Sequence, residues 1–251
     1  MKVSIITATY NSEKFIKTNI DSVNNQTYQN IEHIIIDNKS NDNTLSIAKK
    51  NGKNLRIFSD NDKGIYDAFN KGINEASGEI ISILNSDDFY TDREVLKEVV
   101  NAFETKNTEI VYGNLVYVKR SNESKIVRYW KSNNFVENSF KFGWSPPHPT
   151  FFVKRKIYQK FGNFKLNYGN ASDIELMFRL LEKNKIKSYY LNKILVTMRY
   201  GGKSNNNIYE IFKQNYKILE ILNFKANLFL ILRFLICKIY ERFKQLIFRK
   251  Q

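Results

Sequence analysis

Two adjacent aspartates, Asp87 and Asp88, follow the largely apolar run at residues 80–84. That run is typical of a buried strand, and ligands of open α/β sheets bind at the carboxyl ends of strands. Neighbouring carboxylates repel each other, so the pair is costly unless a cation or strong donors offset its charge. Hard oxygen ligands suit Mg²⁺ or Mn²⁺, which commonly link carboxylates to substrate phosphates. Metal-diphosphate binding is therefore one interpretation, and capping of a helix that begins near Asp92 is the other.

The amino-acid composition limits the classes of protein to which the chain can belong. The chain has 251 residues, 42% of them hydrophobic, which is enough to bury a sizeable core. Its formal net charge of +15 points to an anionic partner such as nucleic acid, anionic lipid or a phosphorylated substrate. The single cysteine, Cys237, excludes an internal disulfide. The apolar start is too short for a signal peptide, and no stretch reaches the roughly 20 apolar residues of a transmembrane helix.

Strand and helix patterns alternate through the first hundred residues. Apolar, β-branched runs at 3–9, 31–36, 55–58 and 80–84 predict strands. Helices are predicted near 15–23, after the polar turn at 38–44, and at 65–76. We expect Asn11 or Ser12 to cap the first helix and Gly78 to end the third. Short connections of this kind predict a mostly parallel sheet with helices on both faces. Polar residues gather where the strands end, so they share one edge and indicate a nucleotide cleft. There is no G-x-G-x-x-G and no P-loop motif.

Six short motifs occur in a fixed order along the first ninety residues. The motifs are VSIITATYN at 3–11, IDNKS at 36–40, DKG at 62–64, NKG at 70–72, GE at 78–79 and NSDD at 85–88. The series resembles the family 2 glycosyltransferases, inverting enzymes with a nucleotide-diphosphate-binding GT-A fold, of the type that builds bacterial cell-surface polysaccharide. The resemblance covers residues 1–205. It implies an α/β fold with a mixed, mostly parallel, Rossmann-like sheet flanked by helices. We expect a nucleotide-binding half at 1–90, an acceptor-binding half at 91–205 and a basic amphipathic helical tail at 206–251.

The resemblance also implies roles for individual residues of the first half. Nucleotide binding falls to Thr7, Ala8, Tyr10, Asp37, Lys63 and Asp87. Tyr10 would stack on the base, Asp37 would accept a hydrogen bond from it, and Lys63 would suit the diphosphate. Asp88 would hold the Mg²⁺ or Mn²⁺ ion, although Ser86 stands where the family's D-x-D motif has its first aspartate. The alternatives are a core aromatic for Tyr10, a helix cap for Asp37 and a solvated charge for Lys63.

In the second half, the resemblance places the catalytic base at Asp173. The family usually has a Glu-Asp pair there, and this chain has Ser172-Asp173. Glu175 is the second choice, because a side chain two positions further along a helix points away from that of Asp173. A plain helix cap is the alternative for Asp173. Contacts to the acceptor or the diphosphate are expected from His148, Glu175, Arg199 and Lys203. The alternatives are a metal ligand or a structural histidine for His148, and a plain flexible turn for the Gly201-Gly202 loop beside Arg199 and Lys203.

Secondary structure in the second half is less clearly patterned. A helix is predicted at 95–103, a strand at 110–118 and another strand at 191–199. Residues 119–125 are expected to form a polar turn, and 128–143 lack a clear period. The three prolines at 146–149 exclude regular structure there.

The last residues, 223–251, mix seven basic side chains with many aromatic and aliphatic ones and carry only one acidic residue, Glu241. This composition predicts an interfacial helix on an anionic membrane surface, part of which packs on the domain or on a partner chain. The resulting prediction is a metal-dependent glycosyltransferase on the cytoplasmic face of the cell membrane. It would move a sugar from a UDP-sugar or similar donor to a saccharide acceptor, which the tail suggests is lipid-linked. A nucleotidyltransferase and a basic nucleic-acid- or membrane-binding module are the alternatives, and we expect no nucleic-acid partner.

Overall fold

The computed structural model describes residues 1–201, 208–223 and 228–247. Its strands are β1 (Val3–Thr9), β2 (Ile31–Asp37), β3 (Leu55–Ser59), β4 (Ile80–Ile83), β5 (Phe89–Tyr90), β6 (Ile110–Lys119), β7 (Asn122–Trp130), β8 (Phe152–Lys154) and β9 (Ser188–Tyr200). Its α-helices are α1 (Ile16–Asn24), α2 (Thr44–Asn51), α3 (Ile65–Glu75), α4 (Val95–Lys106), α5 (Arg155–Phe161), α6 (Ser172–Phe178), α7 (Ile208–Ile221) and α8 (Leu228–Ile247). Short 3-10 segments include η1 (Ser139–Phe142), η2 (His148–Thr150) and η3 (Leu166–Ala171), and a single π-helical turn, η4 (Arg179–Lys183), continues α6.

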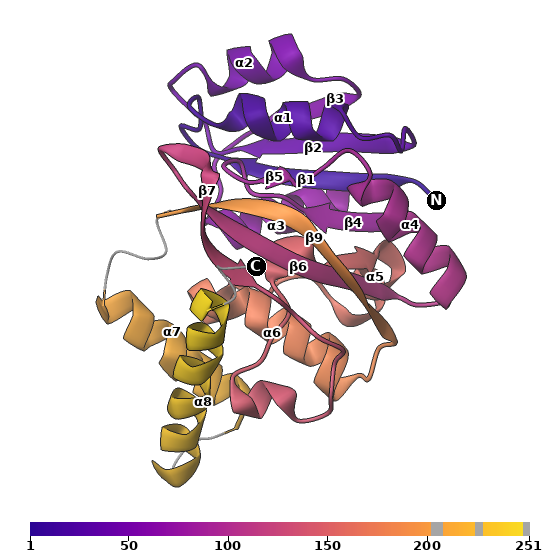
Figure 1. Ribbon diagram of the computed structural model, residues 1–251. Coiled ribbons are helices and arrows are strands. Elements are labelled where there is room, and N and C mark those ends of the chain that lie inside the picture. The colour runs from indigo at the N-terminus through magenta and orange to yellow at the C-terminus, as the bar shows by residue number, and fades with distance from the viewer. Residues whose placement is uncertain (202–207, 224–227, 248–251) are drawn as a thin grey trace.

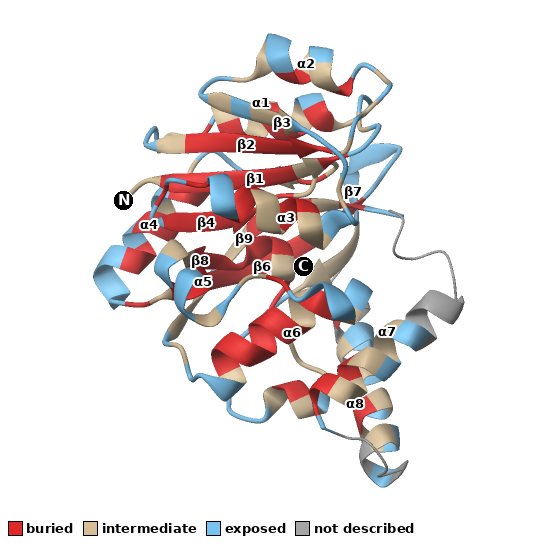
Figure 2. Ribbon diagram, turned by 180° about the vertical axis from the view of Figure 1, so that it is seen from behind, coloured by how far each residue is buried: buried red, intermediate tan, exposed pale blue. Residues whose placement is uncertain are grey.

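One mixed sheet runs through both halves of the chain, in the order β3-β2-β1-β4-β8-β6-β9-β5, with β7 paired to β6 (Figure 1). The first four strands in that order are parallel to one another, as predicted. Alternate side chains of β1 face opposite sides of the sheet. Ile5 packs with residues of α1 and α4, whereas Ile6 packs with residues of α3. Both faces are therefore covered, and Figure 2 shows β1, β2 and β4 almost entirely buried, whereas β3 at the sheet edge is partly exposed.

The second half of the sheet is largely antiparallel. β6 runs antiparallel to β7 and β8 but parallel to β9. β7 corrects the prediction of a polar turn at 119–125, because the chain reverses within Arg120 and Ser121 alone. Most residues of β7 are exposed, so the strand lacks the buried apolar run by which β1 to β4 were predicted. β7 therefore forms a regular strand because it pairs with β6, and not because of a strand pattern in its own sequence.

Three local expectations need correction. Helix α3 ends at Glu75, before Gly78. A Cβ at Gly78 would lie 2.5 Å from Ser4 Oγ, so this glycine permits a close approach to β1 rather than ending the helix. Helix α1 begins without a side-chain cap from Asn11 or Ser12. The proline-rich stretch contains one 3-10 turn, η2, although its backbone is otherwise irregular.

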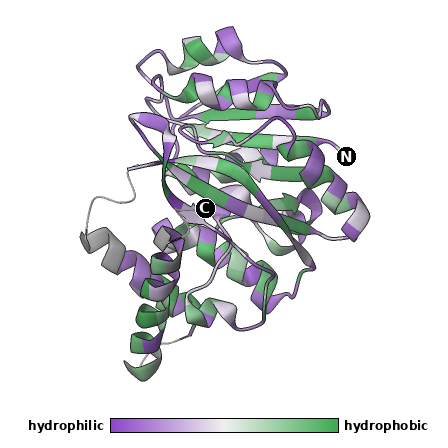
Figure 3. Cartoon of the chain, viewed as in Figure 1, coloured by the Kyte–Doolittle hydropathy of each residue, from purple (hydrophilic) through white to green (hydrophobic). Residues whose placement is uncertain are grey.

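Helices α7 and α8 lie side by side at the end of the molecule away from α2 (Figure 1). Helix α7 contacts η3, and α8 contacts η1 and β7, so both pack on the second half of the domain. Figure 3 shows hydrophobic residues concentrated in the central strands and hydrophilic residues interspersed along α7 and α8. Among the described residues, no helix combines the length and apolarity needed to cross a bilayer.

Candidate functional site

The carboxyl ends of β1, β2 and β3 are joined through Asp37. In register, Thr9 lies beside Asp37, and Asp37 lies beside Ser59. The fully buried Asp37 carboxylate accepts hydrogen bonds from Thr9 Oγ1 at 2.9 Å, Ser59 Oγ at 2.8 Å, and both the amide and hydroxyl of Ser40. Four donors fill the acceptor positions of a carboxylate. Asp37 therefore organises this edge of the sheet, and its predicted contact with a base would require one of these donors to be exchanged.

The turn after β4 presents Asp87 and Asp88 at the same edge. Helix α4 begins at Val95 without a side-chain cap, so the helix-cap interpretation of the aspartate pair is wrong. Asn19 of α1 fixes the turn by donating to the carbonyls of Asn85 and Asp88, at 2.9 and 3.1 Å. Ser86 Oγ lies 3.0 Å from Ser12 Oγ, which connects the turn to the end of β1.

Asp88 is fully buried, and its two oxygens have different surroundings. Oδ2 accepts a hydrogen bond from Asn85 Nδ2 at 2.7 Å, whereas Oδ1 has no protein partner. Burial, and then the charge of Asp87, raise the pKa of Asp88 well above its usual value, although Asn85 and Arg199 act in the opposite direction. A buried carboxylate oxygen without a donor is a position that a cation can complete.

The donor set fits a hard divalent ion that takes most of its ligands from substrate and water. Among the described residues, no group of three His, Cys, Asp or Glu side chains could hold a metal. Mg²⁺ is commonly held by one or two carboxylates together with substrate phosphates, so a single open carboxylate oxygen is compatible with such a site. Asp88 would be the protein ligand.

Two arginines from the second half hold the aspartate turn. Arg199 of β9 is almost completely buried, donates to the carbonyl of Asp87 at 2.5 Å, and pairs with Glu123. Arg120, at the β6–β7 reversal, pairs with the Asp87 carboxylate and lies over the Phe15 ring at 4.6 Å. The structure thus gives Arg199 a positioning role, since its donors already have protein acceptors. Arg120 is the more accessible cation beside the acidic pair, with 38% of its side chain exposed.

Asp173 lies in the first turn of α6, close to an aromatic cluster. Ala171 occupies the N-cap position of α6, and Asp173 Oδ1 accepts a hydrogen bond from the adjacent amide of Ile174, so the helix-cap alternative does not describe it. Burial and the Asp173 carboxylate raise the pKa of Tyr66 well above its usual value. Burial lowers the pKa of His148, and the same carboxylate acts in the opposite direction. His148 lies in the same aromatic cluster as Tyr66, since both rings contact Phe164, and its 3-10 turn packs on the helix that carries Asp173. This is the arrangement that a common acceptor or proton-transfer site requires.

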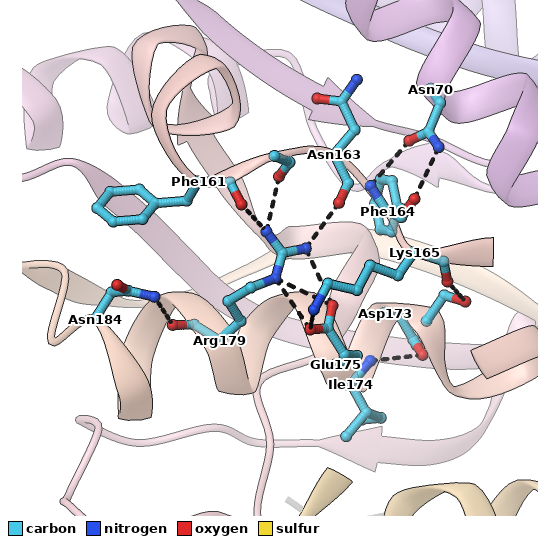
Figure 4. A network of polar contacts seen from close by, with 12 residues as sticks. Asn70, Phe161, Asn163, Phe164, Lys165, Asp173, Ile174, Glu175, Arg179 and Asn184 are labelled. Carbon is cyan, nitrogen blue, oxygen red and sulfur yellow. Dashed lines mark hydrogen bonds and ion pairs between the residues drawn. The ribbon is translucent and has the colours of Figure 1, made fainter. Parts of the chain in front are cut away.

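Glu175 belongs to a buried ion-pair network instead of an open site (Figure 4). Its carboxylate pairs with Arg179 at 3.0 Å and with Lys165 at 2.9 Å. Arg179 also donates to the carbonyls of Phe161, Gly162 and Asn163. Glu175 is therefore engaged in holding the 161–163 loop against α6. Its spacing of four residues from Arg179 is a sequence signal that could have indicated this pairing.

The other predicted contacts lie in different surroundings. Thr7 is fully buried, and its hydroxyl lies 3.0 Å from His33 Nε2, so it supports the strand from inside. Tyr10 is 50% exposed at the end of β1, Ala8 is partly buried, and Lys63 is exposed in the loop before α3. Lys203 lies outside the described residues. None of these observations tests nucleotide contact, which stays a prediction.

The protein-family comparison agrees with this geometry. Residues 4–183 match the model described as glycosyl transferase family 2. The chain belongs to this family. It is a glycosyltransferase with a GT-A-like mixed α/β fold, as the motif series predicted.

Three proteins illustrate what this family 2 glycosyltransferase is similar to. The chain is 28% identical over 209 residues to the "PGL/p-HBAD biosynthesis glycosyltransferase" of Mycobacterium bovis, covering 80% of this chain and 78% of the relative. It resembles S. aureus TarS 1–349 in complex with UDP-GlcNAc at 19% identity and TM-score 0.64, covering 96% of this chain and 82% of that one. It spans 44% of a longer TarS structure. The mannosyltransferase PcManGT from Pyrobaculum calidifontis, in complex with GDP-Man and Mn²⁺, is 16% identical with TM-score 0.62, over 96% and 69% of the two chains.

Several residues around the site of this glycosyltransferase were missed from the sequence. Asn19 and Arg120 reach the aspartate turn from segments 66 and 33 residues away in the chain, which no local pattern reveals. Tyr66 likewise approaches Asp173 from α3. Their common feature is a long sequence separation, so an alternating or helical pattern in any one segment could not have pointed to them.

Proposed function

We propose that the chain transfers a sugar, with inversion, from a nucleotide-diphosphate sugar to a hydroxyl group of a saccharide acceptor. The observation that carries this proposal is Asp88 Oδ1, a buried carboxylate oxygen without a protein partner at the strand edge. The family assignment supports a nucleotide-sugar donor, and a UDP-sugar is our first choice because a structural relative was solved with UDP-GlcNAc.

The donor would lie at the carboxyl ends of β1 to β4. Asp88 would hold Mg²⁺ or Mn²⁺, which supplies charge stabilisation for the departing diphosphate. Tyr10 would stack on the base, Asp87 would lie near the ribose or sugar, and Lys63 would approach the diphosphate. Arg120 joins this set because its guanidinium lies beside Asp87 and is partly exposed. The side chains of Arg199 and Asn19 would keep the turn in place before donor binds.

The acceptor would meet Asp173. In the transfer step, the acceptor oxygen forms a bond to the anomeric carbon while the bond from that carbon to the diphosphate breaks on the opposite face. The hydroxyl proton passes to the Asp173 carboxylate. The nearby His148 and Tyr66 would line the approach. A hollow of about 330 Å³ between η3 and α7, lined by Tyr168, Asn170 and Lys213 among others, offers polar groups to a saccharide.

The proposal also includes a lipid-linked acceptor of cell-surface polysaccharide assembly and a peripheral position at the cytoplasmic face of the membrane. The domain limits of 1–205 and 206–251 belong to this proposal as well. The basic, aromatic-rich C-terminal segment supports the membrane position.

The decisive experiment is calorimetric titration of a panel of nucleotide sugars, with and without Mn²⁺, into the wild type and Asp88→Asn. We expect one donor to bind with Mn²⁺, and the variant to weaken that binding at least tenfold while the metal-free titrations of the two proteins coincide. Asp60→Asn is the matched control, because Asp60 is an exposed carboxylate at the end of β3. Release of free nucleoside diphosphate, not pyrophosphate, should accompany turnover. Equal donor affinity in wild type and Asp88→Asn with Mn²⁺ would contradict the metal site.

A further inference from the structure

Helix α8 has apolar side chains on two opposite faces. At about 100° per residue, Phe234 and Gln245 lie on one face. Both are buried against the domain, at 1% and 8% exposure. Gln245 Oε1 accepts a hydrogen bond from Arg128 Nε of β7 at 2.6 Å. This inward face explains why α8 stays on the domain, but it leaves the other apolar face unexplained.

The outward face carries a continuous stripe of large side chains. They are Phe229, Leu232, Ile236, Ile239, Tyr240 and Phe243, each between 50% and 72% exposed. On the helical wheel the six fall within an arc of about 100°, directly opposite Phe234. Scattered exposed apolar residues are normal, whereas a contiguous stripe marks a surface that meets another apolar phase. Figure 2 shows exposed and intermediate residues along α8 on the side away from the sheet.

Charge decides which partner fits this stripe. From residue 228 to the end, the sequence has six basic residues and one acidic residue. Two copies meeting along this stripe would bring like charges together, which is unfavourable. An anionic lipid surface instead offers opposite charge to the basic residues and an apolar interior to the aromatic and aliphatic ones.

The inward face of α8 also connects the stripe to the proposed active site. Lys238 crosses directly over Gly143, where an added Cβ would lie 3.0 Å from the Lys238 Cα. Lys238 Nζ donates to Asn215 Oδ1 of α7 at 2.6 Å. Burial, and then the charge of Arg242, lower the pKa of Lys238 to about 8, and the Asp173 carboxylate acts in the opposite direction. Helix α7 in turn donates from Gln214 to the carbonyl of Asn170, just before α6.

We propose that the outward face of α8 docks the enzyme on an anionic lipid surface and, through its inward face, holds the acceptor side of the site next to that surface. The docking gives the membrane position proposed above a specific surface, and its evidence is the α8 stripe and its charge. Its consequence, that the acceptor is met at the lipid surface, rests on the proposed function.

Vesicle flotation of the full chain tests the docking. Vesicles of phosphatidylcholine containing phosphatidylglycerol should carry the wild type upward, phosphatidylcholine alone should not, and added salt should reduce binding. Ile236→Gln with Phe243→Gln should lower the partition coefficient roughly tenfold or more, because both side chains lose their apolar contact with lipid. The matched control is Ile126→Gln with Val136→Gln, two exposed apolar residues outside α8, which should float as wild type does.

Thermal melting shows whether each variant is folded, and Phe229→Gln with Ile239→Gln provides a second pair on the same face. Failure of the wild type to float, or equal flotation of both α8 pairs and the control, would overturn the proposal. So would a wild-type dimer in light scattering that the α8 pairs dissociate, because the stripe would then be covered by a second copy. Donor titration on the same proteins separates the two proposals: loss of donor binding in the wild type would refute the glycosyl transfer proposed above and leave the flotation result standing.

Discussion

Each half of the chain contains a buried carboxylate whose partners are supplied by the protein, and the first half also contains one, Asp88, that keeps an oxygen without a partner. In residues 1–90, Asp37 and Asp88 are both fully buried, but Asp37 accepts bonds from Thr9, Ser40 and Ser59, whereas Asp88 Oδ1 has no partner. In residues 91–205, Glu175 is paired with Arg179 and Lys165. Burial therefore does not distinguish a structural carboxylate from a functional one, whereas the number of donors around it does.

The largest expected effect separates Asp173 from Glu175 on the same helix. Asp173→Asn should reduce the turnover number about 10³-fold, because an amide cannot take the proton of the acceptor hydroxyl. Its donor affinity should stay near the wild-type value, because the donor contacts proposed above come from the carboxyl ends of β1 to β4 and not from α6. Glu175→Gln should keep most of the turnover but lower the melting temperature. Steady-state kinetics with donor titration measures the first change, and the reverse pattern would identify Glu175 as the base.

A second prediction concerns the free energy of unfolding in the second half. Arg179→Met should cost about 3–5 kcal/mol, because it leaves Glu175 buried with only Lys165 and removes the donors to three backbone carbonyls. The control in the first half is Lys17→Met, which breaks an exposed ion pair with Asp21 and should cost below about 1 kcal/mol. Urea denaturation measures both. Similar costs for the two variants would show that the Arg179 network contributes no more than a surface pair.

The same contrast explains how much of the molecule could be predicted. β1, β2 and β4 are buried apolar runs, so their positions and the sharing of one edge by Asp37 and Asp88 followed from pattern alone. β7 has no such run and depends on β6 for its order. Asp37 takes two of its donors, Thr9 and Ser59, from distant segments. The donor to Asp88 and the main partner of Glu175 are local, but nothing in the sequence shows that they are the ones engaged. Asp88 could thus be proposed as a metal ligand from its motif. Only the structure shows that one of its carboxylate oxygens has a hydrogen-bond donor and the other has none.

The smallest expected effect is a pH dependence that arises inside the first half. Burial lowers the pKa of His33 to about 3 from 6.5, so the folded chain keeps this side chain neutral while the unfolded chain protonates it. The unfolded state then binds more protons below pH 6.5, and stability falls as the pH falls from 6.5 towards 3. Between pH 7 and pH 5 the loss is about 2 kcal/mol.

His33→Gln removes that proton, so the wild type should lose about 2 kcal/mol more than the variant over this range in urea denaturation. The difference between the two proteins is the appropriate measure, because the shifted pKa values of His148 and Asp88 affect both alike. Glu32 does not interfere with this measurement. Burial alone would raise the pKa of Glu32, but hydrogen bonds from Ser4, Ser77 and Lys2 lower it to about 2. The effect of Glu32 on stability therefore changes only below pH 4.5. Parallel curves for wild type and His33→Gln would mean that His33 is protonated in the folded chain, and that its site beneath Thr7 is more open to water than the structure has it.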